Sequence, residues 1–114
     1  MEFGQYMRTG LHLRFVAETP EKQQEGLMRQ PPLSPNEGAL FVYPELAGRR
    51  FWNKNVGFPI DVGFFDSQRK LTTVETLDAD QEESIEHEAQ YVLEAPRGFF
   101  VGTQRGASLD DLIQ

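Results

Sequence analysis

The sequence predicts a small, mostly β domain: a compact antiparallel sandwich or partly closed barrel of about six or seven short strands, with one short helix near residues 20–27. Three observations support this class. Several segments alternate apolar and polar residues or are rich in β-branched ones. Prolines and turn residues separate these segments, and helices do not alternate with the strands as a parallel α/β sheet requires.

The elements follow in order along the chain. Thr19 is a suitable N-cap for a helix that begins at Pro20 and ends near Leu27, and Ser108 can cap a last helical turn. We expect residues 49–54 and 60–66 to form a hairpin around the loop "NVGFP". The predicted strands cover residues 11–17, 39–44, 49–54, 60–66, 70–77 and 90–96.

The chain has 114 residues, which suits a single domain, expected over residues 11–114 after an N-terminal extension at residues 1–10. Its net charge is −7, and eight acidic residues but no basic one lie between Lys70 and Arg97. We interpret this acidic run as a solvated loop. A net anion is a poor partner for nucleic acid.

Two kinds of segment are missing from the sequence. No run approaches the roughly 20 apolar residues that span a bilayer, and the first ten residues lack the features of a signal peptide. There is also no cysteine, which excludes disulfides and thiolate chemistry. A cytoplasmic and a periplasmic location are both compatible with this composition.

The run "RRFWNKNVGFPIDVGFFD", residues 49–66, concentrates charge and aromatic surface. If residues 49–54 form a strand with Phe51 toward the core, then Arg50, Trp52 and Lys54 share the outer face. One interpretation is structural: a cation–π pair on the indole, with Asp61 neutralising Lys54 across the hairpin. The other is a binding site, in which the indole is a platform and the cations receive a carboxylate or phosphate.

Five motifs occur in a fixed order: "GLMRQ", "EGALFVY", "FWNKN", "PIDVGFFD" and "YVLEAPRG". Together they resemble the domain-of-unknown-function 192 family of bacteria and archaea, over about residues 11–103. The resemblance implies a compact, mostly β domain and no established activity. Its motif positions are Gly26, Leu27, Met28, Gly38, Phe41, Phe51, Trp52, Lys54, Asn55, Pro59, Asp61, Leu93, Glu94 and Gly98.

This sequence departs from the family pattern at two positions. Asn53 and Ala39 stand where the family has methionine, which argues against a metal site built on thioethers. His87 lies among acidic residues, but their spacing matches no known metal motif. We therefore expect no metal and no cofactor.

The leading hypothesis is a non-catalytic binding module for a small anionic or aromatic ligand, or for a peptide end. Its candidate residues are Arg50, Trp52, Lys54, Asp61 and Glu94. One alternative is a small hydrolase or lyase that uses Asp61 and Glu94 as an acid/base pair. Another is an interaction domain whose aromatic patch docks on a partner. We expect a monomer or a weak dimer, and no catalytic residue is assigned. Other motif residues are expected to be structural: Gly26, Met28, Gly38, Phe41, Phe51, Asn55, Pro59 and Gly98.

Overall fold

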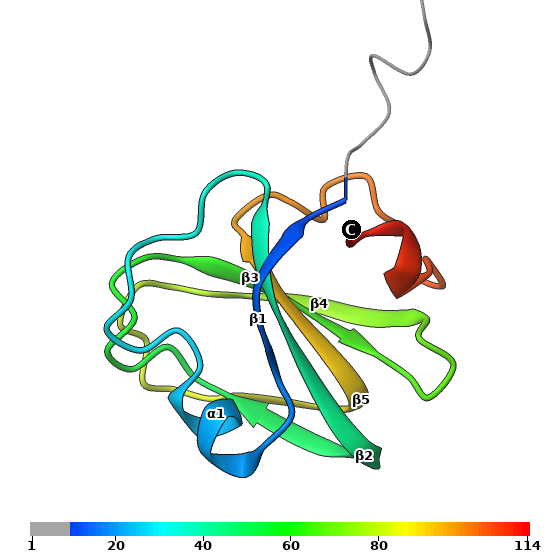
Figure 1. The fold of residues 1–114 in the computed structure, drawn as a ribbon, viewed down its shortest axis with the longest axis horizontal. Coiled ribbons are helices and arrows are strands. Elements are labelled where there is room, and N and C mark those ends of the chain that lie inside the picture. Colours follow the sequence, from blue (N-terminus) through cyan, green and yellow to red (C-terminus); the bar gives the residue numbers. More distant parts are fainter. Residues whose placement is uncertain (1–9) are drawn as a thin grey trace, which may run out of the picture.

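Five strands form one mixed sheet in the computed structural model, which describes residues 10–114 (Figure 1). The order across the sheet is β1-β2-β5-β3-β4, in which β1 and β2 are parallel and the other neighbours antiparallel. The outer strands β1 and β4 do not pair with each other, so the sheet does not close into a barrel. The strands are β1 (His12–Ala17), β2 (Glu37–Phe51), β3 (Ile60–Phe65), β4 (Leu71–Leu77) and β5 (Ile85–Pro96).

The mostly β class and the single short helix are confirmed. Helix α1 (Pro20–Glu25) begins where predicted, because the Thr19 side chain accepts a hydrogen bond from the backbone N–H of Lys22. It ends at Gly26, whose φ of 50° favours glycine. Ser108 likewise caps the short 3₁₀ helix η2 (Leu109–Asp111). The extension predicted for residues 1–10 lies outside the described residues, apart from Gly10.

The strand boundaries differ from the prediction in two ways. Residues 39–44 and 49–54 do not form separate strands, because β2 continues through both segments as far as Phe51. Pro44, which lacks an N–H, lies where the register with β5 shifts between Val42 and Ala47, so the ladder tolerates it. The sheet therefore has five strands rather than six or seven.

The predicted hairpin of residues 49–54 and 60–66 is wrong. Strand β5 lies between β2 and β3 and pairs with both, so the two segments are never neighbours. The sheet is also mixed rather than wholly antiparallel, since β1 returns to β2 in parallel after α1. These pairings join residues that are distant in the chain, which local patterns do not specify.

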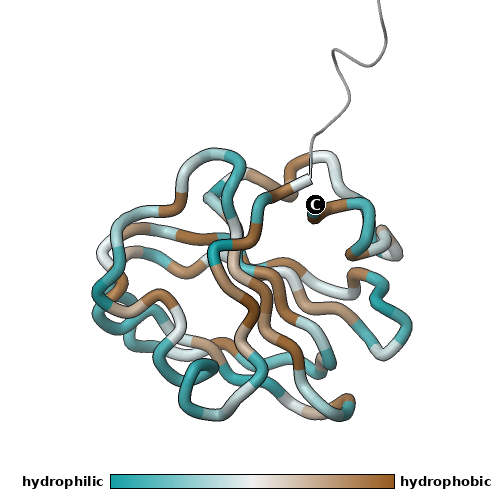
Figure 2. Tube along the Cα trace, in the orientation of Figure 1, coloured by the Kyte–Doolittle hydropathy of each residue, from teal (hydrophilic) through white to brown (hydrophobic). Residues whose placement is uncertain are grey.

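Buried apolar residues form two core clusters, one on each side of the sheet. Figure 2 shows the apolar segments along the strands that supply them. We call one side the helix face, because Leu27 after α1 packs there on Phe41, Val62 and Phe64. We call the other side the C-terminal face, because Phe100, Leu109 and Leu112 cover Leu93 there. Alternation along each strand therefore decides which core cluster a residue joins.

The two ends of the described chain lie next to each other. Leu11 makes two backbone hydrogen bonds to the C-terminal segment: its N–H donates to the Leu112 carbonyl at 2.9 Å, and its carbonyl accepts from the Gln114 N–H at 3.0 Å. The Gln114 amide also donates to the carbonyl of Gly10. Within residues 10–114, no helix has the length and apolar character needed to cross a bilayer.

Candidate functional site

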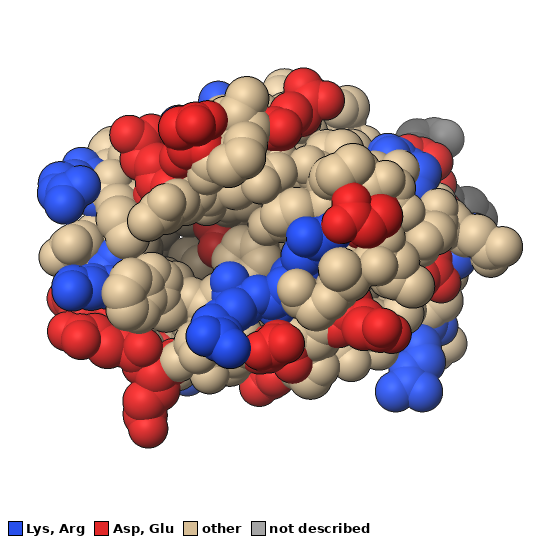
Figure 3. Space-filling model, turned by 90° about the horizontal axis from the view of Figure 1, so that it is seen from below, with Lys and Arg blue, Asp and Glu red and all other residues tan. Residues whose placement is uncertain are grey.

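A pocket of about 480 Å³ opens on the helix face. Its walls come from α1 and the loop after it, from β2, and from the loop that follows Phe51. Figure 3 shows the molecule hollowed on this side, with an acidic side chain visible inside and both signs of charge around the opening. This volume lies in the range of small-molecule sites, which is roughly 300–1,000 Å³.

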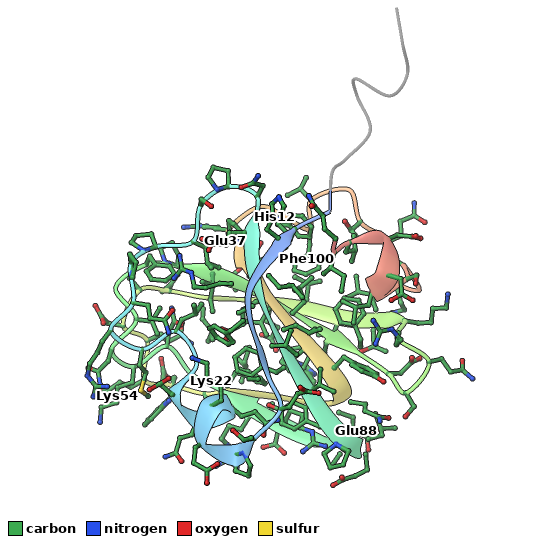
Figure 4. All side chains as sticks on the ribbon, viewed as in Figure 1. His12, Lys22, Glu37, Lys54, Glu88 and Phe100 are labelled. Carbon is green, nitrogen blue, oxygen red and sulfur yellow. The ribbon has the colours of Figure 1, made fainter. Side chains whose placement is uncertain are left out.

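Arg50, Trp52 and Lys54 all line this pocket. The Trp52 side chain is 43% exposed, and the Lys54 ammonium lies 5.4 Å from the centre of its ring. Figure 4 shows Lys54 on the loops beyond the sheet, on the side where α1 lies. Alternation along a strand does not bring these three side chains together, because β2 ends at Phe51. The loop after Phe51 positions Trp52 and Lys54.

Phe51 itself is buried in the core, as predicted, and contacts Phe41 and Phe64 edge to face. Burial of this ring anchors the end of β2 under the pocket. Phe41, Phe51 and Trp52, together with Tyr43, give the pocket aromatic walls. Burial raises the pKa of Tyr43 to about 12. The Arg49 guanidinium, 3.9 Å from the ring centre, acts to lower this pKa, and the Glu94 carboxylate acts to raise it.

Glu94 is buried at the inner end of the pocket. It lies on β5 opposite Ala39 of β2 and Val62 of β3, so its side chain is on the helix face. Only 4% of the residue is exposed, and Oε1 has no hydrogen-bond partner among the described residues. Burial without a compensating charge raises the pKa of this carboxyl to about 8.

Asn53 is a site residue that the sequence analysis missed. Its Nδ2 donates to the carbonyls of Phe58 and Asp78, both at 2.9 Å, and these bonds tie the pocket loop to the loop after β4. Its Oδ1 is buried and has no donor within residues 10–114. The signal was an asparagine at a position where methionine is usual, which we interpreted only as the loss of a thioether.

Asp61 does not join the pocket. It pairs with Ala95 across β3 and β5, which places its side chain on the C-terminal face. Its Oδ1 accepts from the Thr76 hydroxyl at 2.6 Å, and its Oδ2 accepts from the Gly98 N–H at 2.8 Å. Asp61 is therefore a satisfied structural group, and the predicted contact with Lys54 across a hairpin is not formed.

Asp61 and Glu94 consequently lie on opposite faces of the sheet. A pair of carboxyl groups that cleaves one bond must flank it from a single cleft. The structure does not bring these two together. Across residues 10–114, no group of three or more His, Asp or Glu side chains is arranged to hold a metal ion. His87 contacts Glu75 and the ring of Phe64 rather than the surrounding acids of its own segment.

Comparison with known proteins gives a family and two similar structures. A model of the DUF192 family, described as uncharacterized ACR, matches residues 9–110. A protein from Sinorhizobium meliloti 1021, described as a "putative transcription regulator", is 29% identical with a TM-score of 0.75, over 80% of this chain and 74% of that one. A protein of unknown function from Novosphingobium aromaticivorans DSM 12444 is 25% identical with a TM-score of 0.76, over 82% and 71%. No curated protein matches the chain.

Proposed function

This chain belongs to the DUF192 family, and we propose that it is a non-catalytic binding module for a small ligand with an apolar body. One observation carries the proposal: Trp52, Lys54 and the buried Glu94 line the same pocket of about 480 Å³. Aromatic walls offer apolar contact, and a few charged groups can orient a ligand between them.

The rim supports recognition of an anionic group. Arg50 is held by Glu86 at 3.2 Å, whereas Lys54 has no carboxylate within 4.0 Å among the described residues. An ammonium that is not neutralised by the protein, next to an exposed indole, can receive a carboxylate or phosphate. Lys54 is therefore the rim cation to which we assign this contact.

Trp52 provides the test, because it is the only tryptophan in the chain. We expect 3-phenylpropionate or phenyl phosphate to change its emission in a saturable titration. Replacing Lys54 by Gln should weaken this binding by about fivefold or more. Lys70→Gln, which removes the same charge outside the pocket, is the matched control. No response of Trp52 to either anion, or equal affinities in both variants, would overturn the proposal.

Neither alternative from the sequence gains support from the site. The acid/base pair is separated by the sheet, as described above. For direct nucleic-acid binding, the net charge of −7 is unfavourable, whatever the description of the Sinorhizobium protein. No observation among residues 10–114 identifies a docking partner for the exposed indole.

A further inference from the structure

The pocket contains two buried acceptor atoms that the protein leaves unpaired. Glu94 Oε1 and Asn53 Oδ1 are the buried side-chain atoms of residues 10–114 without a hydrogen-bond partner, and both residues line the pocket. Leaving such an atom unsatisfied is unfavourable, because the atom gives up its hydrogen bonds to water and gains none in the protein. Asn53 Oδ1 only accepts hydrogen bonds, and Glu94 Oε1 accepts when the carboxyl is ionised, so a ligand that satisfies both atoms must bring donors.

The Asn53 amide cannot remove this deficit by rotating. Its Nδ2 already donates to two carbonyls, Phe58 and Asp78. A flipped amide would place Oδ1 against these two carbonyl oxygens, which offer no proton. The Asn53 oxygen therefore keeps its position and its unused capacity to accept a hydrogen bond.

A primary ammonium group fits this set of partners. It carries three N–H donors and no acceptor, and its positive charge complements a carboxylate. The rings of Phe41, Tyr43, Phe51 and Trp52 line the same pocket and offer apolar contact to the body of such a ligand. A carboxylate or phosphate at the same place would supply no donor to Asn53, and it would meet the ionised form of Glu94 as a like charge.

We infer that the inner end of the pocket binds a primary ammonium group through Glu94 and Asn53, so that the ligand class is a small amine with an apolar body. This inference rests on the proposed function. Combined with an anion at Lys54 on the rim, it describes a ligand that carries an amine at one end and an acidic group at the other.

No other charged side chain near the pocket takes the place of a ligand ammonium beside Glu94. Glu25 is paired with Lys22 at 3.1 Å and Arg50 with Glu86, and Arg49 lies over the Tyr43 ring. Lys54 and Glu82 remain at the rim, with opposite charges. No cationic side chain of the described residues forms an ion pair with Glu94.

The first test titrates phenethylammonium chloride against Trp52 emission. Glu94→Gln should weaken its binding by about tenfold or more, because the amide keeps the shape but loses the charge. Glu88→Gln, which removes an exposed acid from the same strand, should leave the affinity unchanged. The N,N,N-trimethyl derivative, which keeps the charge but has no N–H, should bind several-fold more weakly than the primary amine. The melting temperature at pH 7 verifies that Glu94→Gln is folded.

The outcomes separate the two proposals. If 3-phenylpropionate binds and depends on Lys54, but phenethylammonium does not bind or is unaffected by Glu94→Gln, the ammonium site is overturned and the binding module stands. Equal affinity of the trimethyl derivative would also overturn the assignment of N–H donors. If no probe changes the Trp52 emission, both proposals fail.

The second test measures how the binding affinity depends on pH and whether binding releases a proton. Because the pKa of the Glu94 carboxyl in the folded protein without ligand is about 8, this carboxyl is mostly protonated at pH 7. An ammonium that pairs with its ionised form must release that proton, so affinity should rise between pH 6 and 8. Calorimetry in two buffers of different ionisation enthalpy should show the release. An affinity that falls with rising pH would mean that protonated Glu94 donates to a ligand acceptor, which would overturn the inference.

A peptide amino terminus and a free amine share this chemistry, and one comparison distinguishes them. Phe-Gly-Gly amide should bind more tightly than phenethylammonium if the ligand is a peptide end, and more weakly if it is a free amine. The N-acetylated peptide has no ammonium and should not bind through Glu94. Binding of the acetylated peptide as tightly as the free one would contradict the proposed ammonium contact.

Discussion

Asp61 and Glu94 show how the face of a strand decides the role of a residue. Both are buried carboxyl groups in central strands. Asp61 receives two donors, from Thr76 and Gly98, on the C-terminal face. Glu94 receives none at Oε1 on the helix face. Asp61 is thus satisfied within the fold, whereas Glu94 keeps an unpaired buried oxygen.

At this scale we predict that Asp61→Asn lowers the free energy of unfolding by about 1–3 kcal/mol. If the new amide NH₂ faces the Gly98 N–H, a donor faces a donor. If it faces the Thr76 hydroxyl, the bond that this hydroxyl donates to Asp61 is lost. Urea unfolding measures the loss, with the exposed Asp80→Asn as control. Anion binding at Trp52 should be unchanged. A variant as stable as the parent would show that these bonds contribute little.

At the scale of elements, β2 is packed tightly between β1 and β5. Gly38 of β2 has no room for a side chain: a Cβ there would lie 2.9 Å from the carbonyl oxygen of Glu94 and 2.9 Å from Leu11 Cδ1. One of these neighbours is backbone, which cannot rotate away. The glycine in the "EGALFVY" motif therefore sets how closely the strands approach.

We predict that Gly38→Ala destabilises the protein by about 1–3 kcal/mol, because the strands must shift to accept the methyl group. Gly57 offers the control, since a Cβ there has nothing within 4 Å and its φ is not in the left-handed region. Gly57→Ala should be neutral or raise stability by up to about 1 kcal/mol through the unfolded state. Denaturant midpoints compare the two. Equal effects would mean that the crowding at Gly38 relaxes easily.

The sequence predicts those elements that depend on neighbours in the chain. The cap at Thr19, the proline at the start of α1 and the burial of Phe51 are all local and correct. The hairpin was wrong because its two segments are each paired with β5, which comes more than twenty residues later. The register between β3 and β5 places Asp61 and Glu94 on opposite faces of the sheet. Local sequence patterns do not specify this register, so they could not show that the two carboxyl groups are apart.

For the whole molecule, the buried carboxyl makes stability depend on pH. The pKa of Glu94 is about 8 in the folded protein against an ordinary value of 4.5. Between these values the folded protein holds a proton that the unfolded chain releases, so stability falls as the pH rises. The slope from this group is at most about 1.4 kcal/mol per pH unit.

We therefore predict that Glu94→Gln is increasingly more stable than the parent as the pH rises from 5 to 8. Free energies of unfolding from urea titrations at several pH values test this. Taking the difference between variant and parent removes the contributions of groups common to both. A difference that does not change across this range would show that Glu94 is solvated in the folded state.

The Arg14–Glu37 pair acts in the opposite direction. The guanidinium of Arg14 donates to both carboxylate oxygens of Glu37, at 2.9 and 2.8 Å, and joins β1 to β2. This contact lowers the pKa of Glu37 to about 2, so its stabilisation is present above the ordinary 4.5 and is lost as the pH falls toward 2. Glu37→Gln should thus be less stable than the parent at pH 6, and the difference should shrink by pH 2.5. A constant difference in acid unfolding curves would contradict this.

The candidate site could be predicted only in part. Trp52, Lys54 and Glu94 lie at motif positions, and Arg50 was chosen by strand alternation within the charged run of residues 49–66. All four line one pocket. Asn53 was not, because its importance lies in an oxygen that folding leaves unpaired. Composition records which polar groups exist, whereas only packing determines which of them are satisfied.

Because Gly10 and Gln114 are in contact, the same fold can be built from a chain whose segments are joined in a different order. Since these residues already touch, a short linker could fuse them, and a new opening in the exposed turn at residues 66–69 would keep all strand pairings. Such circular permutants would keep the sheet and the pocket. Their new termini would lie in the turn between β3 and β4, at the opposite edge of the sheet.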